Sequence, residues 1–148
     1  MSRTWNDLLT ARRVAREPSS KQELDEIRAM IATNMKDANV PGLSSQGRYE
    51  FAYNAARLIA TLVVRAAGYR VIAKNGHHYF TFQGLETADK AFVKMAAYFD
   101  SARTKRNDFS YDAPVDVAES EALDLIDTVQ KFLQQVEAWV RARDPSLG

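Results

Sequence analysis

One stretch, residues 48–68, constrains the fold of this chain more than any other. As a helix, it places seven apolar residues at the three-and-four spacing of a buried face: Phe51, Ala55, Leu58, Ile59, Leu62, Val63 and Ala66. Ser44 or Ser45 can cap the start of this helix, and Gly68 can end it in a left-handed conformation. The stretch is too short and too charged to span a bilayer. We therefore predict a central helix buried in the core of a folded domain.

Four further stretches with helical spacing surround the central one. They cover residues 4–14, 20–39, 88 to beyond 99, and a last helix that opens with the capping pair Asp116 and Glu119 and ends near Arg143. Ser20 and Glu23 have the spacing of a capping box. Residues 70–84 break the pattern, and we expect an ordered loop with a short helical turn there, because no partner strand is visible. The prediction is an all-α, antiparallel up-and-down bundle of about five helices, forming one domain over residues 1–148.

Charge and cysteine content narrow the classes of function. The 148 residues include 20 Lys and Arg against 19 Asp and Glu, for a formal net charge of +1. This balance gives no general attraction to nucleic acids or membranes, so such binding requires a local patch. The absence of cysteine excludes disulfides, thiol catalysis and thiolate metal sites. No secretory signal is visible at the N-terminus, and we expect a cytoplasmic protein that needs no cofactor and does not bind membranes.

Two adjacent histidines, His77 and His78, are the only histidines of the chain. Adjacent side chains diverge on any regular element, so this pair is poorly suited to binding one metal ion. One of them can serve as a general base, because an unperturbed histidine titrates near neutrality. The competing interpretation, which we favour, is a loop histidine that hydrogen-bonds to the backbone.

A basic segment around residues 103–107 is the second candidate site. It contains Arg103, Lys105, Arg106 and Asn107, with Tyr111 about one helical turn further on. Arginine can bind phosphate oxygens with two parallel hydrogen bonds. A phenol titrates near pH 10, which makes Tyr111 a poor base, so the segment favours binding over catalysis. The alternative is a solvated helix end balanced by nearby aspartates.

The start of the central helix is the third candidate. Arg48, Tyr49 and Tyr53 could receive an anion at a helix N-terminus, or the two tyrosines could pack against a neighbour. We favour packing. Because aromatic residues are enriched in subunit interfaces, Tyr49, Tyr53 and Trp139 are candidates for the contact surface of a homodimer.

Taken together, these segments resemble the HEPN-domain family over residues 20–143. The resemblance rests on the helix of residues 48–56, on Gly76-His77-His78, and on Lys105-Arg106-Asn107 with Tyr111-Asp112 before a last amphipathic helix. HEPN domains are small helical bundles that commonly dimerise. Many are metal-independent ribonucleases of toxin–antitoxin and phage-defence systems, often beside a nucleotidyltransferase-type partner protein.

The family signature is an Arg, usually followed by a polar residue such as Asn, and then a His a few residues further on. Arg106 and Asn107 match its first half, but Tyr111 stands where the His is expected. The resemblance therefore implies a catalytically degraded member that binds RNA or a nucleotide within a toxin–antitoxin-like system. Arg103, Arg106, Asn107, Tyr111, His77 and His78 are its candidate binding residues. The alternatives are an active endoribonuclease using Arg106 and Tyr111 with a histidine from elsewhere, and a structural helical adaptor.

Overall fold

Six α-helices account for most of the residues that the structure describes. The computed structural model describes residues 3–109 and 116–148. Its elements, in chain order, are α1 (Trp5–Thr10), β1 (Val14–Arg16), α2 (Lys21–Ala38), α3 (Ser45–Ala66), β2 (Tyr69–Val71), α4 (His77–Ala88), the 3-10 helix η1 (Lys90–Phe92), α5 (Val93–Asp108), α6 (Glu119–Arg143) and the 3-10 helix η2 (Pro145–Leu147).

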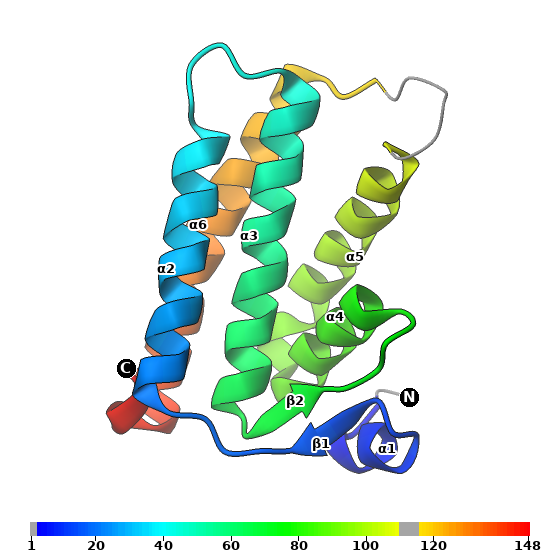
Figure 1. Ribbon diagram of the computed structural model, residues 1–148, viewed down its shortest axis with the longest axis vertical. Helices are drawn as coiled ribbons and strands as arrows, with labels where there is room; N and C mark the ends of the chain where they lie inside the picture. Colours follow the sequence, from blue (N-terminus) through cyan, green and yellow to red (C-terminus); the bar gives the residue numbers. More distant parts are fainter. Residues whose placement is uncertain (1–2, 110–115) are drawn as a thin grey trace.

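The four long helices α2, α3, α5 and α6 run alternately up and down along the length of the molecule (Figure 1). Helix α3 lies at the centre, in contact with α2, α4, α5 and α6. The all-α bundle is thus confirmed. None of the described helices is long and apolar enough to cross a bilayer. The described residues form six α-helices where about five were expected, because α4 forms where a loop with a short helical turn was predicted.

Helix α3 has the boundaries that its sequence predicts. The Ser44 hydroxyl accepts a hydrogen bond from the Gly47 N–H at 3.0 Å, and Gly68 follows the helix with a φ of +92°. Six of the seven predicted stripe residues are buried, and Phe51 is half-buried. The other buried positions of α3 include small residues, among them Ala52, Ala56 and Ala60. Because α3 is apolar on several sides, helices can pack around it.

Residues 4–14 and 69–85 differ from their predicted structures. Helix α1 ends at Thr10, Arg12 adopts a left-handed φ of 58°, and Val14 begins a strand. That strand pairs antiparallel with β2, with Val14 opposite Val71 and Arg16 opposite Tyr69. Strands of three residues are too short to show a clear alternation of apolar and polar residues, and the two paired strands lie far apart in the sequence. The sequence pattern therefore did not predict them. The short sheet lies at one end of the bundle (Figure 1).

The segment predicted as a loop with a short helical turn, residues 70–84, overlaps the twelve-residue helix α4, which begins at His77 and continues to Ala88. Gly76 precedes α4 with a φ of +71°, and no side chain caps the first turn. Aromatic and β-branched residues, which have weak helix propensity, dominate its first half. Burial of Thr81, Phe82, Gly84 and Leu85 provides the stabilisation that the local sequence lacks.

Two predicted capping pairs are also corrected. The Ser20 hydroxyl accepts from the Glu23 N–H at 3.1 Å, but the Glu23 carboxylate binds Arg65. Helix α6 begins at Glu119 after Ala118, and the Glu121 carboxylate accepts from the Ala118 N–H at 3.3 Å. Asp116 therefore does not cap α6. In the first pair, the Glu23 carboxylate binds Arg65, which is remote in the sequence, instead of the start of its own helix. The spacing of Ser20 and Glu23 does not reveal such a distant partner.

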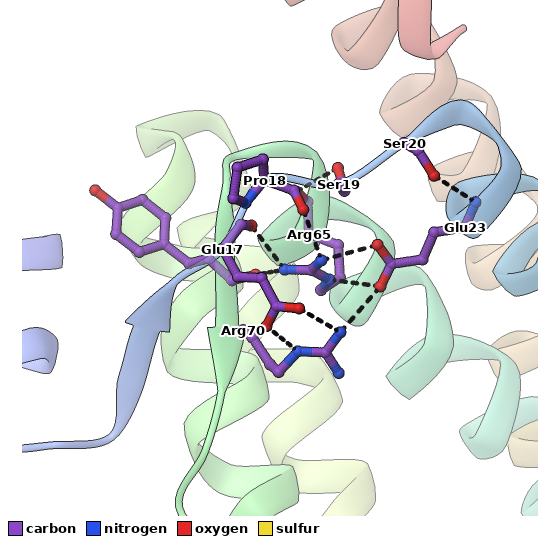
Figure 2. Close-up of polar contacts among 8 residues, drawn as sticks. Glu17, Pro18, Ser19, Ser20, Glu23, Arg65 and Arg70 are labelled. Carbon is purple, nitrogen blue, oxygen red and sulfur yellow. Dashed lines mark hydrogen bonds and ion pairs between the residues drawn. The ribbon is translucent and has the colours of Figure 1, made fainter.

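A buried arginine joins the end of α3 to the start of α2 (Figure 2). The Arg65 guanidinium donates to both carboxylate oxygens of Glu23 at 2.9 and 2.8 Å. It also donates to the backbone carbonyls of Glu17, Tyr69 and Pro18. Arg70 lies beside it and bridges the carboxylates of Glu17 and Glu23. Since the Arg65 donors are all engaged within the chain, we assign this residue a structural role.

Two of the three aromatic residues proposed for a dimer interface lie inside the bundle. Tyr53 is 0% exposed and Tyr49 is 7% exposed. Trp139 is half-buried, and its indole N–H donates to Asp89 at 3.1 Å. The prediction that Tyr49 and Tyr53 form a contact surface between subunits is therefore wrong, because helices of the same chain already cover them.

Candidate functional site

Tyr53 lies where α3, α4 and α5 meet, and polar side chains from all three helices surround it. Its hydroxyl shares a hydrogen bond of 3.0 Å with Nδ1 of His78, from the first turn of α4. Its ring also packs edge-on against Phe82 of α4, with the ring centres 6.1 Å apart. These contacts hold His78 at the junction of the three helices.

Three arginines lie around this tyrosine–histidine pair. Arg57 lies one turn after Tyr53 on α3, and the Arg106 guanidinium lies 5.8 Å from the centre of the Tyr53 ring. Arg103, one turn before Arg106 on α5, lies 5.5 Å from the centre of the Tyr79 ring. We refer to Arg57, Arg103 and Arg106 as the arginine cluster. Two helices that are distant in sequence contribute to it.

The carboxylates near the arginine cluster do not balance its charge. Asp100 accepts from Arg103 at 2.7 Å, and Glu50 lies 3.7 Å from Arg106, beyond hydrogen-bond distance. Arg57 forms no ion pair with any described residue, and its Nε is buried without a hydrogen-bond partner. The buried Nε is a costly donor without a partner, but the Arg57 side chain as a whole is only half-buried, so an added anion would form charge-assisted hydrogen bonds with the accessible part of its guanidinium.

Burial sets the direction of the pKa shifts around the cluster, and the arginine charges add to the shift of His78. Burial, followed by the charges of Arg57 and Arg106, lowers the pKa of His78 from 6.5 to about 4. Burial raises the pKa of Tyr53 to about 12. At neutral pH His78 is therefore uncharged and Tyr53 is protonated. Burial also lowers the pKa of Arg57, because its charge is partly removed from water.

We expect the imidazole of His78 to titrate near pH 4, as followed by its NMR chemical shift. Arg106→Ala should raise this pKa toward 6.5, because it removes a nearby positive charge. The native pKa is the lower one, so the unfolded state takes up the proton first as the pH falls. The contribution of His78 to stability is therefore complete above about pH 6.5 and is lost as the pH falls to about 4. A midpoint near 6.5 in the wild type would contradict this geometry.

The structure brings together only part of the predicted set of site residues. Arg103, Arg106 and His78 converge at the cluster. The ring of His77 turns away and its Nδ1 lies 3.1 Å from the Ala73 carbonyl oxygen, as the backbone-bonded interpretation expects. Tyr111 lies outside the described residues.

The other basic and polar residues singled out in the sequence have different surroundings. Lys105 pairs with Glu121 and lies 6.0 Å from the centre of the Tyr49 ring, while Asn107 is exposed near the end of α5. Arg48 donates to the carbonyls that end α2 and form the following turn, so it stabilises that connection. Of the two interpretations for the start of α3, anion binding and packing, the structure therefore favours packing.

Arg57 and the contact between Tyr53 and His78 are the parts of the site that the sequence interpretation missed. Arg57 carried a signal in the sequence, since it interrupts the otherwise apolar run of residues 55–60. The contact between Tyr53 and His78 had no such signal, because it joins residues of two different helices that are distant in the sequence. Among the described residues, no group of three His, Asp or Glu side chains is arranged to hold a metal ion.

Comparisons of this chain with protein-family models, curated proteins and solved structures find no match. The HEPN resemblance thus rests on the sequence segments given above.

Proposed function

We propose that this protein is a HEPN-like, catalytically degraded component of a toxin–antitoxin-like system that binds RNA or a nucleotide at the arginine cluster. One observation supports binding above all: Arg57 has a buried, unpaired Nε and no carboxylate partner among the described residues. Arginines from two helices supply donors that suit phosphate oxygens. Catalysis has less support, because the pKa of about 4 makes the neutral His78 a weak base.

Binding of single-stranded RNA by the purified protein tests this proposal. We expect the affinity to fall as the salt concentration rises, because phosphate contacts release counterions. Arg57→Ala and Arg106→Ala should each weaken binding by about 1.5–3 kcal/mol, the range for a hydrogen bond to a charged group. Fluorescence anisotropy with a labelled oligonucleotide measures both effects.

Arg141→Ala is the matched control, since this arginine is exposed in the last turn of α6. It removes the same charge without changing the cluster and should leave the affinity nearly unchanged. Equal losses for all three variants would indicate nonspecific attraction to positive charge. No binding of RNA or nucleotide up to millimolar concentration would favour the structural adaptor instead.

An active, metal-independent endoribonuclease is the second candidate. The supporting observation is that His78, from a segment remote from Arg106 in the sequence, lies within the field of the arginine cluster. A ribonuclease of this kind should cleave RNA in the presence of EDTA and lose cleavage in His78→Ala, whereas His77→Ala should retain it. Tyr111→Phe should also abolish cleavage if the phenol takes part. We expect binding without efficient cleavage.

The HEPN resemblance extends the proposal to assembly, and it supports a homodimer and a nucleotidyltransferase-type partner protein. A cytoplasmic location is proposed because the sequence contains no cysteine, as is usual in a reducing compartment. Because Tyr49 and Tyr53 are internal, we place the subunit contact at a hollow of about 380 Å³ between α5 and α6, lined by Met95 and Tyr98. Tyr98 is among the few large apolar side chains that are exposed.

A further inference from the structure

A second feature lies directly beside the arginine cluster. A hollow of about 360 Å³ separates the exposed edges of α2 and α3. Met30, Thr33 and Asn34 of α2 line one side, and Asn54, Arg57 and Leu58 of α3 line the other. Arg57 belongs both to this hollow and to the arginine cluster. Any ligand that binds the cluster through Arg57 therefore lies at the edge of the hollow.

The lining combines apolar surface with amide groups that have hydrogen-bonding capacity to spare. Asn34 donates through Nδ2 to the Met30 carbonyl at 2.9 Å, which leaves its Oδ1 as an acceptor. The Asn54 carboxamide makes no hydrogen bond to another described residue, so it offers both a donor and an acceptor. Carboxamides can pair with the polar edge of a nucleobase, and apolar side chains can cover its face.

A similar hollow elsewhere in the bundle also carries free amides among the described residues, but its arginine is fully engaged. It measures about 340 Å³, lies between α2 and α6, and is lined by Arg28 and Gln134 among others. Its arginine is engaged, since Arg28 binds Glu137 through two hydrogen bonds and also donates to Asp25 and to the Leu147 carbonyl. The hollow beside Arg57 is therefore distinguished by its unpaired arginine.

We propose that the hollow between α2 and α3 holds the base and ribose of a nucleotide whose phosphate is bound by the arginine cluster. The volume is near the lower end of the range of small-molecule sites, about 300–1,000 Å³, which suits one nucleotide. This inference rests on the proposed function, and it adds that a base is recognised besides the phosphate. The ligand is either a free nucleotide or one nucleotide of an RNA strand.

The methionines of the chain allow a direct test with the full-length protein. Met30 lies in the proposed hollow, Met35 lines the one between α2 and α6, and Met95 lines the one between α5 and α6. With ¹³C-labelled methionine methyl groups, NMR reports each hollow separately. The probes are AMP, GMP, CMP and UMP, with ribose 5-phosphate as the control that lacks a base.

We expect at least one nucleotide to shift the Met30 signal and to leave Met35 and Met95 unchanged. Ribose 5-phosphate should bind more weakly and leave Met30 almost unshifted. Asn54→Ala should weaken binding of that nucleotide by about three- to tenfold, the loss expected for one or two neutral hydrogen bonds. Gln134→Ala removes a comparable amide from the other hollow and should have no effect.

Two results would overturn the inference while leaving phosphate binding in place. One is equal affinity of the nucleotides and ribose 5-phosphate without a Met30 shift, and the other is a shift confined to Met35 or Met95. If neither the nucleotides nor ribose 5-phosphate binds, and RNA does not bind either, the proposed function fails together with the inference. If RNA binds through Arg57 and Arg106 but no nucleotide shifts Met30, only the inference fails.

Discussion

Replacement of the buried Arg65 by alanine should lower the free energy of unfolding by about 3–5 kcal/mol, the range for breaking one side of a buried ion pair. The Arg65 side chain is 4% exposed, and its hydrogen bonds reach Glu23 and three backbone carbonyls. The variant leaves the Glu23 carboxylate and those carbonyls with fewer partners. Urea denaturation followed by circular dichroism measures the change.

The neighbouring Arg70 provides the control for this experiment. It pairs with Glu17 and also contacts Glu23, but its side chain is 46% exposed. Because water screens exposed ion pairs, Arg70→Ala should cost no more than about 1 kcal/mol. Arg65→Lys should remain destabilising, since lysine keeps the charge but lacks the planar fork of five donors. Equal effects of Arg65→Ala and Arg70→Ala would show that burial of Arg65 does not matter.

The second large effect concerns the core face of α3. Leu62 is 0% exposed, and Leu62→Ala should lower the free energy of unfolding by about 2–5 kcal/mol through lost burial and a residual cavity. Leu123→Ala is the matched control, because Leu123 is 48% exposed on α6. Thermal or urea denaturation compares the two variants. A change near zero at Leu62 would contradict the assignment of the core face.

Stability and function use arginine in opposite ways on the same helix. Arg65, at the end of α3, has each of its donors engaged within the chain, as Figure 2 shows. Arg57, two turns earlier, retains an unpaired Nε beside the hollow between α2 and α3. Removing Arg65 should therefore reduce stability, whereas removing Arg57 should chiefly reduce anion binding. Measuring both properties in both variants separates the two roles.

The sequence by itself determined the features that depend on neighbouring residues. The apolar spacing of residues 48–68, a serine cap at residue 44 or 45, and Gly68 defined α3, because capping and helical periodicity act within a few residues. The same signals predicted the all-α class.

Only the tertiary structure decided which of these residues meet. The β1–β2 pairing and the burial that stabilises α4 depend on residues remote in the sequence. So do the hydrogen bond between Tyr53 and His78 and the unpaired Nε of Arg57. Hydrogen-bond partners and local charge are set by the packing of different helices, and the pKa of His78 depends on both. No local pattern of residues contains that information.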